Sequence, residues 1–160
     1  MKSKASFYFA MVIALFTVSC GGKDEPVNLK KNVYKIEVST TENSMYYWES
    51  VVMQINDDKA SSVNIKNAPD LTVELESQYA KTFKSMKKGQ ALSIFETSQP
   101  VSGITLSLGY LFDDDATSGE DDYPFTCTVK VYKDNKLIET KNQNITITSY
   151  ETITLNYHNQ

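Results

Sequence analysis

The segment FDDDATSGEDDY (residues 112–123) contains six acidic side chains within ten positions. Carboxylate oxygens are the ligands that calcium prefers, and the best-placed candidates are Asp113, Asp115, Glu120 and Asp122. The spacing departs from an EF-hand, because the sixth position counted from Asp113 is serine and the twelfth is proline. We expect a solvated loop whose charge prevents the adjoining strands from pairing with other chains, and calcium binding is the alternative.

Side chains suited to catalysis are few. His158 is the only histidine and lies two residues from the C-terminus, where chains usually fray. Cys127 shares a strand face with Phe125 and Val129, so we interpret it as a small buried hydrophobic residue rather than a nucleophile. The patterns G-x-S-x-G, H-E-x-x-H, C-x-x-C and the phosphate-binding glycine loops are all missing from the sequence. We therefore expect neither an enzyme nor a bound cofactor.

A second candidate site is the aromatic segment MYYWES (residues 45–50). On a strand, Tyr46 and Trp48 would share one face, and exposed aromatic rings form flat platforms for sugar rings or partner proteins. A single tryptophan in a two-sheet protein more often packs between the sheets. A core position is the interpretation that we favour for Trp48, and a ligand platform of Tyr46 and Trp48 is the alternative.

From Val33 onward, short alternating runs of Thr, Val, Ile and Tyr are separated by Asn, Asp and Gly, a texture typical of many short strands. The clearest hairpin is VKVYKDNKLIE, in which Asp134 and Asn135 suit a two-residue turn. The last run loses its alternation near Ser149 and Tyr150, which indicates a bulge or a turn. The expected strands are 33–40, 45–55, 62–66, 71–76, 91–97, 103–112, 125–132, 136–141 and 144–157.

One segment has helical spacing. Tyr79, Phe83 and Met86 recur at i, i+4 and i+7, and Gly89 follows as a stop signal, which favours a helix over residues 77–89. Eight or nine strands with at most one short helix predict an all-β, antiparallel two-sheet β-sandwich, immunoglobulin-like or transthyretin-like. Residues 33–160 are the length of a single such domain.

The first 19 residues have the pattern of a secretory signal peptide. Lys2 and Lys4 precede an apolar run that is too short to span a bilayer, and Cys20 follows the run directly. The arrangement resembles a bacterial lipoprotein signal, which implies cleavage before Cys20, acylation of its thiol (for example with palmitate) and membrane attachment through the lipid. Residues 20–32 are polar and contain Gly and Pro, so we expect a flexible tether between the lipid and the domain.

The segment KDEP, shortly after Cys20, resembles the export signal of surface-exposed lipoproteins of Bacteroidetes-type Gram-negative bacteria. By the usual sorting rule, Gly21 in place of aspartate argues against retention at the inner membrane. The resemblance implies an outer-membrane lipoprotein that faces the cell surface. The periplasmic face of the same membrane is the alternative.

Charge excludes one class of partner. The leader carries two of the 16 basic residues and none of the 20 acidic ones, which leaves 14 against 20 and a net charge of −6 in the mature chain. All the basic residues are lysine, so bidentate arginine contacts to nucleic acid are missing. We expect a non-enzymatic binding or accessory module for a protein or a glycan. A structural subunit of a pilus-type surface assembly and a calcium-binding surface domain are the alternatives.

Overall fold

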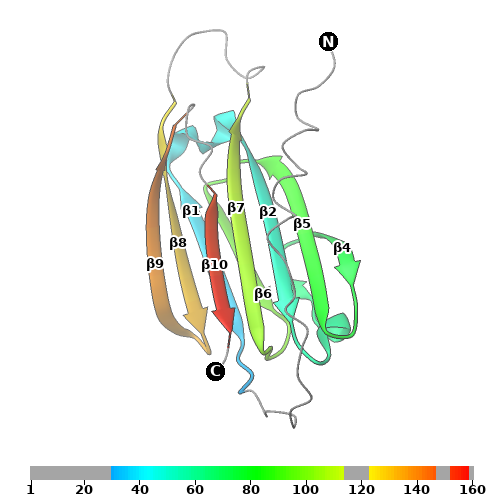
Figure 1. Cartoon of the computed structure of the whole chain (residues 1–160). Coiled ribbons are helices and arrows are strands. Elements are labelled where there is room, and N and C mark those ends of the chain that lie inside the picture. The colour runs from blue at the N-terminus through cyan, green and yellow to red at the C-terminus, as the bar shows by residue number, and fades with distance from the viewer. Residues whose placement is uncertain (1–29, 114–122, 147–151, 159–160) are drawn as a thin grey trace.

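The computed structural model describes residues 30–113, 123–146 and 152–158, which form two antiparallel five-stranded sheets packed as a sandwich (Figure 1). The fold class predicted from the sequence is thereby confirmed. The first sheet has the order β3 (Ile65–Lys66), β6 (Leu92–Thr97), β1 (Tyr34–Thr40), β8 (Phe125–Lys133) and β9 (Lys136–Ile145). The second has the order β10 (Ile153–His158), β7 (Gly103–Phe112), β2 (Tyr47–Asn56), β5 (Ala80–Lys88) and β4 (Thr72–Glu76).

Alternation along the strands decides which side chains form the core. In β7, the apolar residues at every second position, such as Leu106 and Leu108, face the first sheet and are fully buried. Cys127 of β8 is buried among them, as its strand position predicts. The other inward-facing members of the core include Ile36, Val38, Val51, Met53, Ile55, Ile104, Phe125, Val129, Val131, Ile153 and Leu155.

The helix expected over residues 77–89 is wrong, because Ala80–Lys88 forms strand β5 between β2 and β4. The same residues alternate: Phe83 is buried while Met86 faces outward and Tyr79 is exposed, so the helical stripe is not buried as a unit. The helical elements in the described residues are two single-turn 3-10 helices, η2 (Glu42–Tyr46) and η3 (Ala60–Ser62). Strand pairing on both sides of β5 has overridden the local spacing.

The predicted hairpin between β8 and β9 is confirmed. Asp134 and Asn135 both have positive φ, 49° and 65°, as a two-residue turn of this kind requires. The last expected strand, 144–157, is instead shared between two sheets. Its first residues end β9 and its last form β10, whereas the predicted break at Ser149 and Tyr150 lies outside the described residues.

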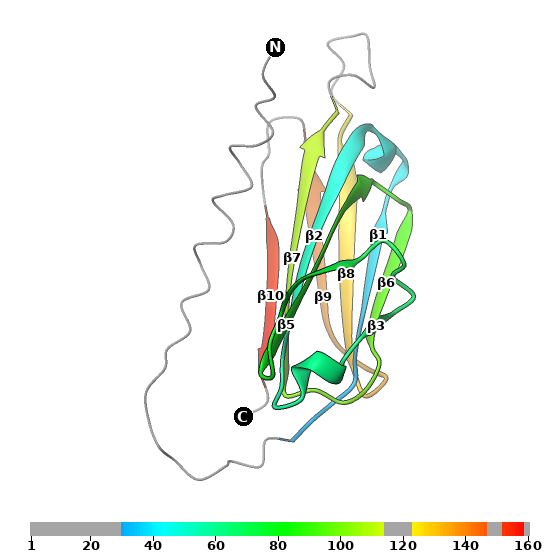
Figure 2. The same cartoon turned by 90° about the vertical axis from the view of Figure 1, so that its right-hand side faces the viewer.

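The sandwich has two distinct ends (Figures 1 and 2). At the tether end, the first described residues meet the connections after β2 and before β7, and Lys31 contacts Asp57. At the distal end lie η2, the end of β7 and the start of β8. With about 3.3 Å per residue, the ten residues of β2 separate these ends by about 30 Å.

Candidate functional site

Trp48 lies on the outer face of the second sheet, near the distal end. Its inward-facing neighbour Tyr47 is fully buried, whereas Trp48 is half-buried and is not part of the core. Its cross-strand partners are Leu111 on β7 and Lys88 on β5. The interpretation of Trp48 as a core residue is therefore wrong, because the register of β2 assigns the inner face to Tyr47.

Small side chains lie beside Trp48 on the same face. The next outward row of the sheet contains Gly109, Ser50 and Met86. A Cβ atom added to Gly109 would meet nothing within 4 Å, so the surface next to the tryptophan is open. Met86 and Leu111 are exposed at its flanks. Together, Trp48, Ser50, Gly109, Met86 and Leu111 form a flat, partly apolar surface, which we call the Trp48 platform.

One of the acidic candidates contacts this platform through a lysine. The ammonium nitrogen Nζ of Lys88 lies 4.6 Å from the centroid of the Trp48 ring, and it also forms an ion pair with Asp113. The backbone N–H of Asp113 donates to the carbonyl oxygen of Tyr46 at 2.9 Å. The start of the acidic segment is therefore connected to Trp48 by one side chain.

Tyr46 does not share a strand face with Trp48, because it belongs to η2 and β2 begins one residue later. Its ring packs against Tyr123 with 4.4 Å between centroids. Phe112 stacks on the same Tyr123 at 6.0 Å, and the hydroxyl of Tyr47 donates to the Tyr123 carbonyl oxygen at 2.9 Å. These contacts bring together the ends of β7 and β8, on either side of the acidic segment.

The remaining predicted site residues are placed only in part. Asp115, Glu120 and Asp122 lie outside the described residues, as does Cys20. Within the described ranges, no three His, Cys, Asp or Glu side chains are arranged to hold a metal ion. The same ranges contain no helix that is long and apolar enough to span a membrane.

The tether end contains a buried carboxylate that sequence reasoning missed. The Asp57 side chain is 1% exposed and accepts hydrogen bonds from Lys31 Nζ at 2.9 Å, from the Lys59 N–H at 2.9 Å and from the N–H and hydroxyl of Ser102 at 3.0 and 3.1 Å. Burial alone would raise the pKa of Asp57, but these donors lower it to about 2. The end of the tether is thus held to the domain by a satisfied buried charge.

A second buried carboxylate lies between the sheets in the distal half. Glu49 is 1% exposed; its Oε2 accepts a hydrogen bond from the Tyr110 hydroxyl at 3.0 Å, and its Oε1 has no partner among the described atoms. Burial raises the pKa of Glu49, only partly opposed by Tyr110, by the charge of Lys87 and by the neighbouring Ser93 hydroxyl. Burial also raises the pKa of the Cys127 thiol, which lies 3.5 Å from the same tyrosine oxygen. This surrounding does not activate the thiol as a nucleophile.

The sequence distinguishes one of these two buried carboxylates but not the other. Glu49 occupies an inward position in the alternation of β2, between Tyr47 and Val51, and this position was a usable signal. Asp57 lies just after the strand, in a polar run, where nothing distinguishes it from Asp58. Its partners Lys31 and Ser102 are 26 and 45 residues away, so only the fold reveals them.

Comparisons with known proteins identify the fold and no family. No family model matches the chain, and no curated protein matches it. A calcium-bound protein from Parabacteroides distasonis, solved by NMR, is similar with a TM-score of 0.58 and 19% identity over 86% of this chain and 100% of that one. A DUF4425 family protein from Bacteroides ovatus is similar with a TM-score of 0.54 and 16% identity over 80% of this chain and 94% of that one.

Proposed function

We propose that this protein is a lipoprotein of the outer membrane, anchored through Cys20 and exposed at the cell surface, whose sandwich acts as a non-enzymatic binding module. The Trp48 platform is the contact surface for a glycan or a protein ligand. The observation that carries the proposal is the half-buried tryptophan on an open sheet face, at the end of the domain opposite to Lys31 and Asp57.

The direction of the domain supports this role. The described chain joins the domain at the Asp57 end, so the Trp48 platform lies about 30 Å from that junction. A domain whose Asp57 end is directed toward the membrane presents the platform outward. Both of the similar solved structures described above come from Parabacteroides and Bacteroides, and the leader resembles those of surface lipoproteins from this group.

The chemistry of the platform suits a flat ligand. The half-buried indole provides a large rigid surface at low entropic cost, and Lys88 adds a cation over its ring. Ser50 and Gly109 leave space for a ring to lie along the sheet next to the indole.

Binding of the purified chain to a glycan array and to intact cells tests the proposal. Replacing Trp48→Ala should lower affinity about 30-fold, the effect of removing a contact worth about 2 kcal/mol. Tyr132→Ala is the matched control, because Tyr132 lies on the first sheet with Lys35 Nζ 4.2 Å from its ring centroid. Binding that is equally weakened by both substitutions, or by neither, contradicts the assignment of the platform.

Membrane attachment has its own test. Cys20→Ala should release the protein from the membrane fraction or leave it attached through an uncleaved leader, with a corresponding change in mass. Unchanged mass and unchanged fractionation of the Cys20→Ala protein would contradict lipid anchoring. Protease treatment of intact cells then distinguishes the surface from the periplasmic face.

Calcium binding by the acidic segment is a second candidate, favoured by the calcium-bound state of the structurally similar protein from Parabacteroides distasonis. In this chain Asp113 is engaged by Lys88, so a cation bound by Asp113 must compete with that ion pair. Trp48 is the only tryptophan, and its fluorescence reports directly on the position of Lys88.

Calcium titration followed by Trp48 fluorescence and by thermal melting tests this candidate. A calcium-specific change in fluorescence with a rise in Tm of several degrees, both abolished by Asp113→Asn combined with Asp115→Asn, would support it. If calcium has no larger effect than magnesium at matched ionic strength, the acidic segment is a solvated loop rather than a calcium site.

A further inference from the structure

The first sheet is incomplete at its β6 edge. Strand β3 has only two residues and pairs with β6 at Thr97 and Glu96 alone. Asn67 follows with a positive φ of 59°, which turns the chain away from the sheet and across to β4. Among the described residues, no strand therefore pairs with the rest of β6 on this side.

The alternation of hydrogen bonds along β6 shows which of its backbone N–H and C=O groups have no partner strand. The N–H of Thr40 donates to the Ala91 carbonyl oxygen at 3.0 Å, so in the antiparallel register Ser93 and Phe95 bond to β1. On the opposite side of β6, the N–H of Ser98 donates to the Asn64 carbonyl oxygen at 2.8 Å, which fits the same alternation. The N–H and C=O groups of Leu92 and Ile94 consequently point outward, along the open edge.

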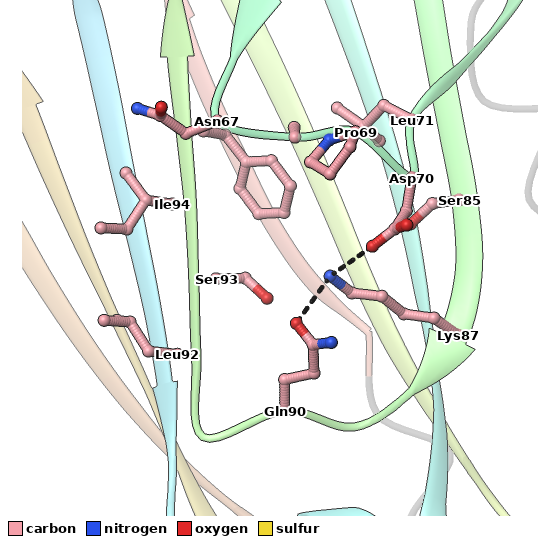
Figure 3. Close-up of a pocket in the computed structure, with 12 residues that line it drawn as sticks. Asn67, Pro69, Asp70, Leu71, Ser85, Lys87, Gln90, Leu92, Ser93 and Ile94 are labelled. Atoms are coloured by element: carbon pink, nitrogen blue, oxygen red, sulfur yellow. Dashed lines mark hydrogen bonds and ion pairs between the residues drawn. The ribbon is translucent and has the colours of Figure 1, made fainter.

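A groove of about 230 Å³ runs along this open edge. It lies between β6, the connection Asn67–Leu71 and the end of β5 (Figure 3). The hydroxyl of Ser93 points from β6 toward the side chains of Gln90 and Lys87 and is buried near the Glu49 carboxyl group, but it makes no hydrogen bond among the described atoms. A buried hydroxyl without a partner at the wall of a groove is a group that a guest can satisfy.

One end of the groove carries a cation. Lys87 Nζ lies 3.1 Å from Gln90 Oε1 and 3.5 Å from Asp70 Oδ2. The Gln90 contact lies toward the Leu92 end, away from Asn67, and the Asp70 contact lies across the groove from Ser93 (Figure 3). An added strand antiparallel to β6 continues the line of β3, so its C-terminal end reaches Leu92, Gln90 and Lys87.

We propose that the open edge of β6 binds an extended peptide of another protein as an added antiparallel strand, with a C-terminal carboxylate on Lys87. The backbone groups of Leu92 and Ile94 supply the main-chain hydrogen bonds of this mode of recognition. The Gln90 amide and the Ser93 hydroxyl provide further polar contacts to the end of the peptide. This site is separate from the Trp48 platform and does not depend on it.

The other exposed edge on this side of the sandwich is a poorer template. Strand β4 has a register shift between Val73 and Leu75, and Glu74 forms an ion pair with Lys84 of β5 at 2.5 Å. Bulges and charges at an edge oppose the pairing of further strands. The edge of β6 has an uninterrupted register over its whole pairing with β1.

Amide hydrogen exchange of the full chain, followed by NMR, is the first test. The amides of Leu92 and Ile94 should exchange rapidly, whereas those of Ser93 and Phe95 should be protected by β1. Slow exchange of Leu92 and Ile94 in the free chain would overturn the proposal, because the edge would already be occupied.

The second test uses a library of proline-free octapeptides with free C-terminal carboxylates, and the same library with C-terminal amides. Retained peptides should prefer the carboxylate about tenfold and should slow the exchange of Leu92 and Ile94 at least tenfold. Lys87→Gln should abolish the preference for the carboxylate, and Lys84→Gln, on the opposite face of β5, should preserve it. Ile94→Pro removes an outward N–H without removing a hydrogen bond to β1, and it should abolish retention.

Distinct outcomes overturn the proposal. If no peptide is retained better by the wild-type chain than by the Ile94→Pro and Lys87→Gln variants, the edge is not a peptide site. Protection that appears at Thr72–Glu76 instead assigns the binding to β4. Concentration-dependent self-association that protects Leu92 and Ile94 without any peptide makes a second copy the occupant. The Trp48→Ala variant should bind the peptides as well as the wild-type chain does. A negative result for peptide binding at β6 is therefore distinguishable from a negative result for ligand binding at the Trp48 platform.

Discussion

The two buried carboxylates of this protein show how differently its ends are built. Asp57, at the tether end, accepts four hydrogen bonds, and its pKa is lowered to about 2. Glu49, in the distal half, accepts one bond from Tyr110, keeps one oxygen without a described partner, and has a raised pKa. Both side chains are about 1% exposed, so burial alone does not explain the difference.

The number of donors is what separates them. Backbone N–H groups and a lysine hold the Asp57 carboxylate in its ionised form, whereas a single tyrosine hydroxyl does not offset the desolvation of Glu49. The Asp57 carboxylate at the tether end is therefore fully satisfied, although the nearby Asn32 Oδ1 is buried without a hydrogen-bond partner among the described atoms. The distal half keeps unsatisfied polar atoms, at Glu49 and Ser93, close to the groove along β6.

The largest expected effect comes from removing the satisfied charge. Asp57→Ala should lower the free energy of unfolding by about 3 to 5 kcal/mol, because it leaves the N–H groups of Lys59 and Ser102 and the ammonium of Lys31 without their acceptor. Urea denaturation measures it. Asp58→Ala is the control: its side chain is 62% exposed, and little change is expected. Equal losses of stability in the two variants would show that the buried Asp57 carboxylate contributes no more than the exposed Asp58 carboxylate.

Asp57 should also make the free energy of unfolding depend on pH in the acid range. Because the folded pKa of Asp57 is lowered from 3.8 to about 2, its contribution is fully present above about pH 4 and is lost as the pH falls toward 2. The loss should amount to about 2 kcal/mol over this window. Asp57→Asn should lack this part of the pH dependence, as measured by the urea midpoint between pH 5 and 2.

Glu49 should respond with the opposite sign. Its folded pKa is raised above the ordinary 4.5, so stability is lost as the pH rises from 4.5 through the folded pKa. Glu49→Gln should therefore stabilise the protein by about 1 to 2 kcal/mol at pH 8 and leave it unchanged at pH 4. Glu37→Gln is the control, since its hydrogen bond from Lys35 lowers the pKa of the partly exposed Glu37. A Glu49→Gln protein that is less stable at pH 8 would show that the buried charge is satisfied after all.

The Lys88–Asp113 ion pair, in which the lysine is exposed, should contribute least to stability among the charges compared here. Lys88→Gln should change the free energy of unfolding by less than about 1 kcal/mol, because the Lys88 side chain is 43% exposed and solvent screens the pair. It should nevertheless alter the fluorescence of Trp48, which loses the adjacent cation. Lys84→Gln on the same face of β5 should leave the fluorescence as it is. If neither substitution changes the fluorescence, Lys88 does not contribute to the surroundings of Trp48 in the platform.

Local patterns in the sequence determined much of this fold. Alternation in β7 and β8 assigned the inward residues, including Cys127, and two turn-forming residues, Asp134 and Asn135, specified the hairpin that follows β8. Such features depend on a few consecutive residues, which is why they can be read without a structure.

Tertiary structure decided what depends on distant partners. Ala80–Lys88 became a strand because β2 and β4 pair with it, against its own helical spacing. Trp48 faces outward because the preceding turn of η2 sets the phase of β2, so that Tyr47 takes the inner position. Asp57 became the best-satisfied charge because donors 26 and 45 residues away converge on it. A short window of sequence records the propensity of each segment, whereas pairing and burial are set by long-range contacts that no single window contains.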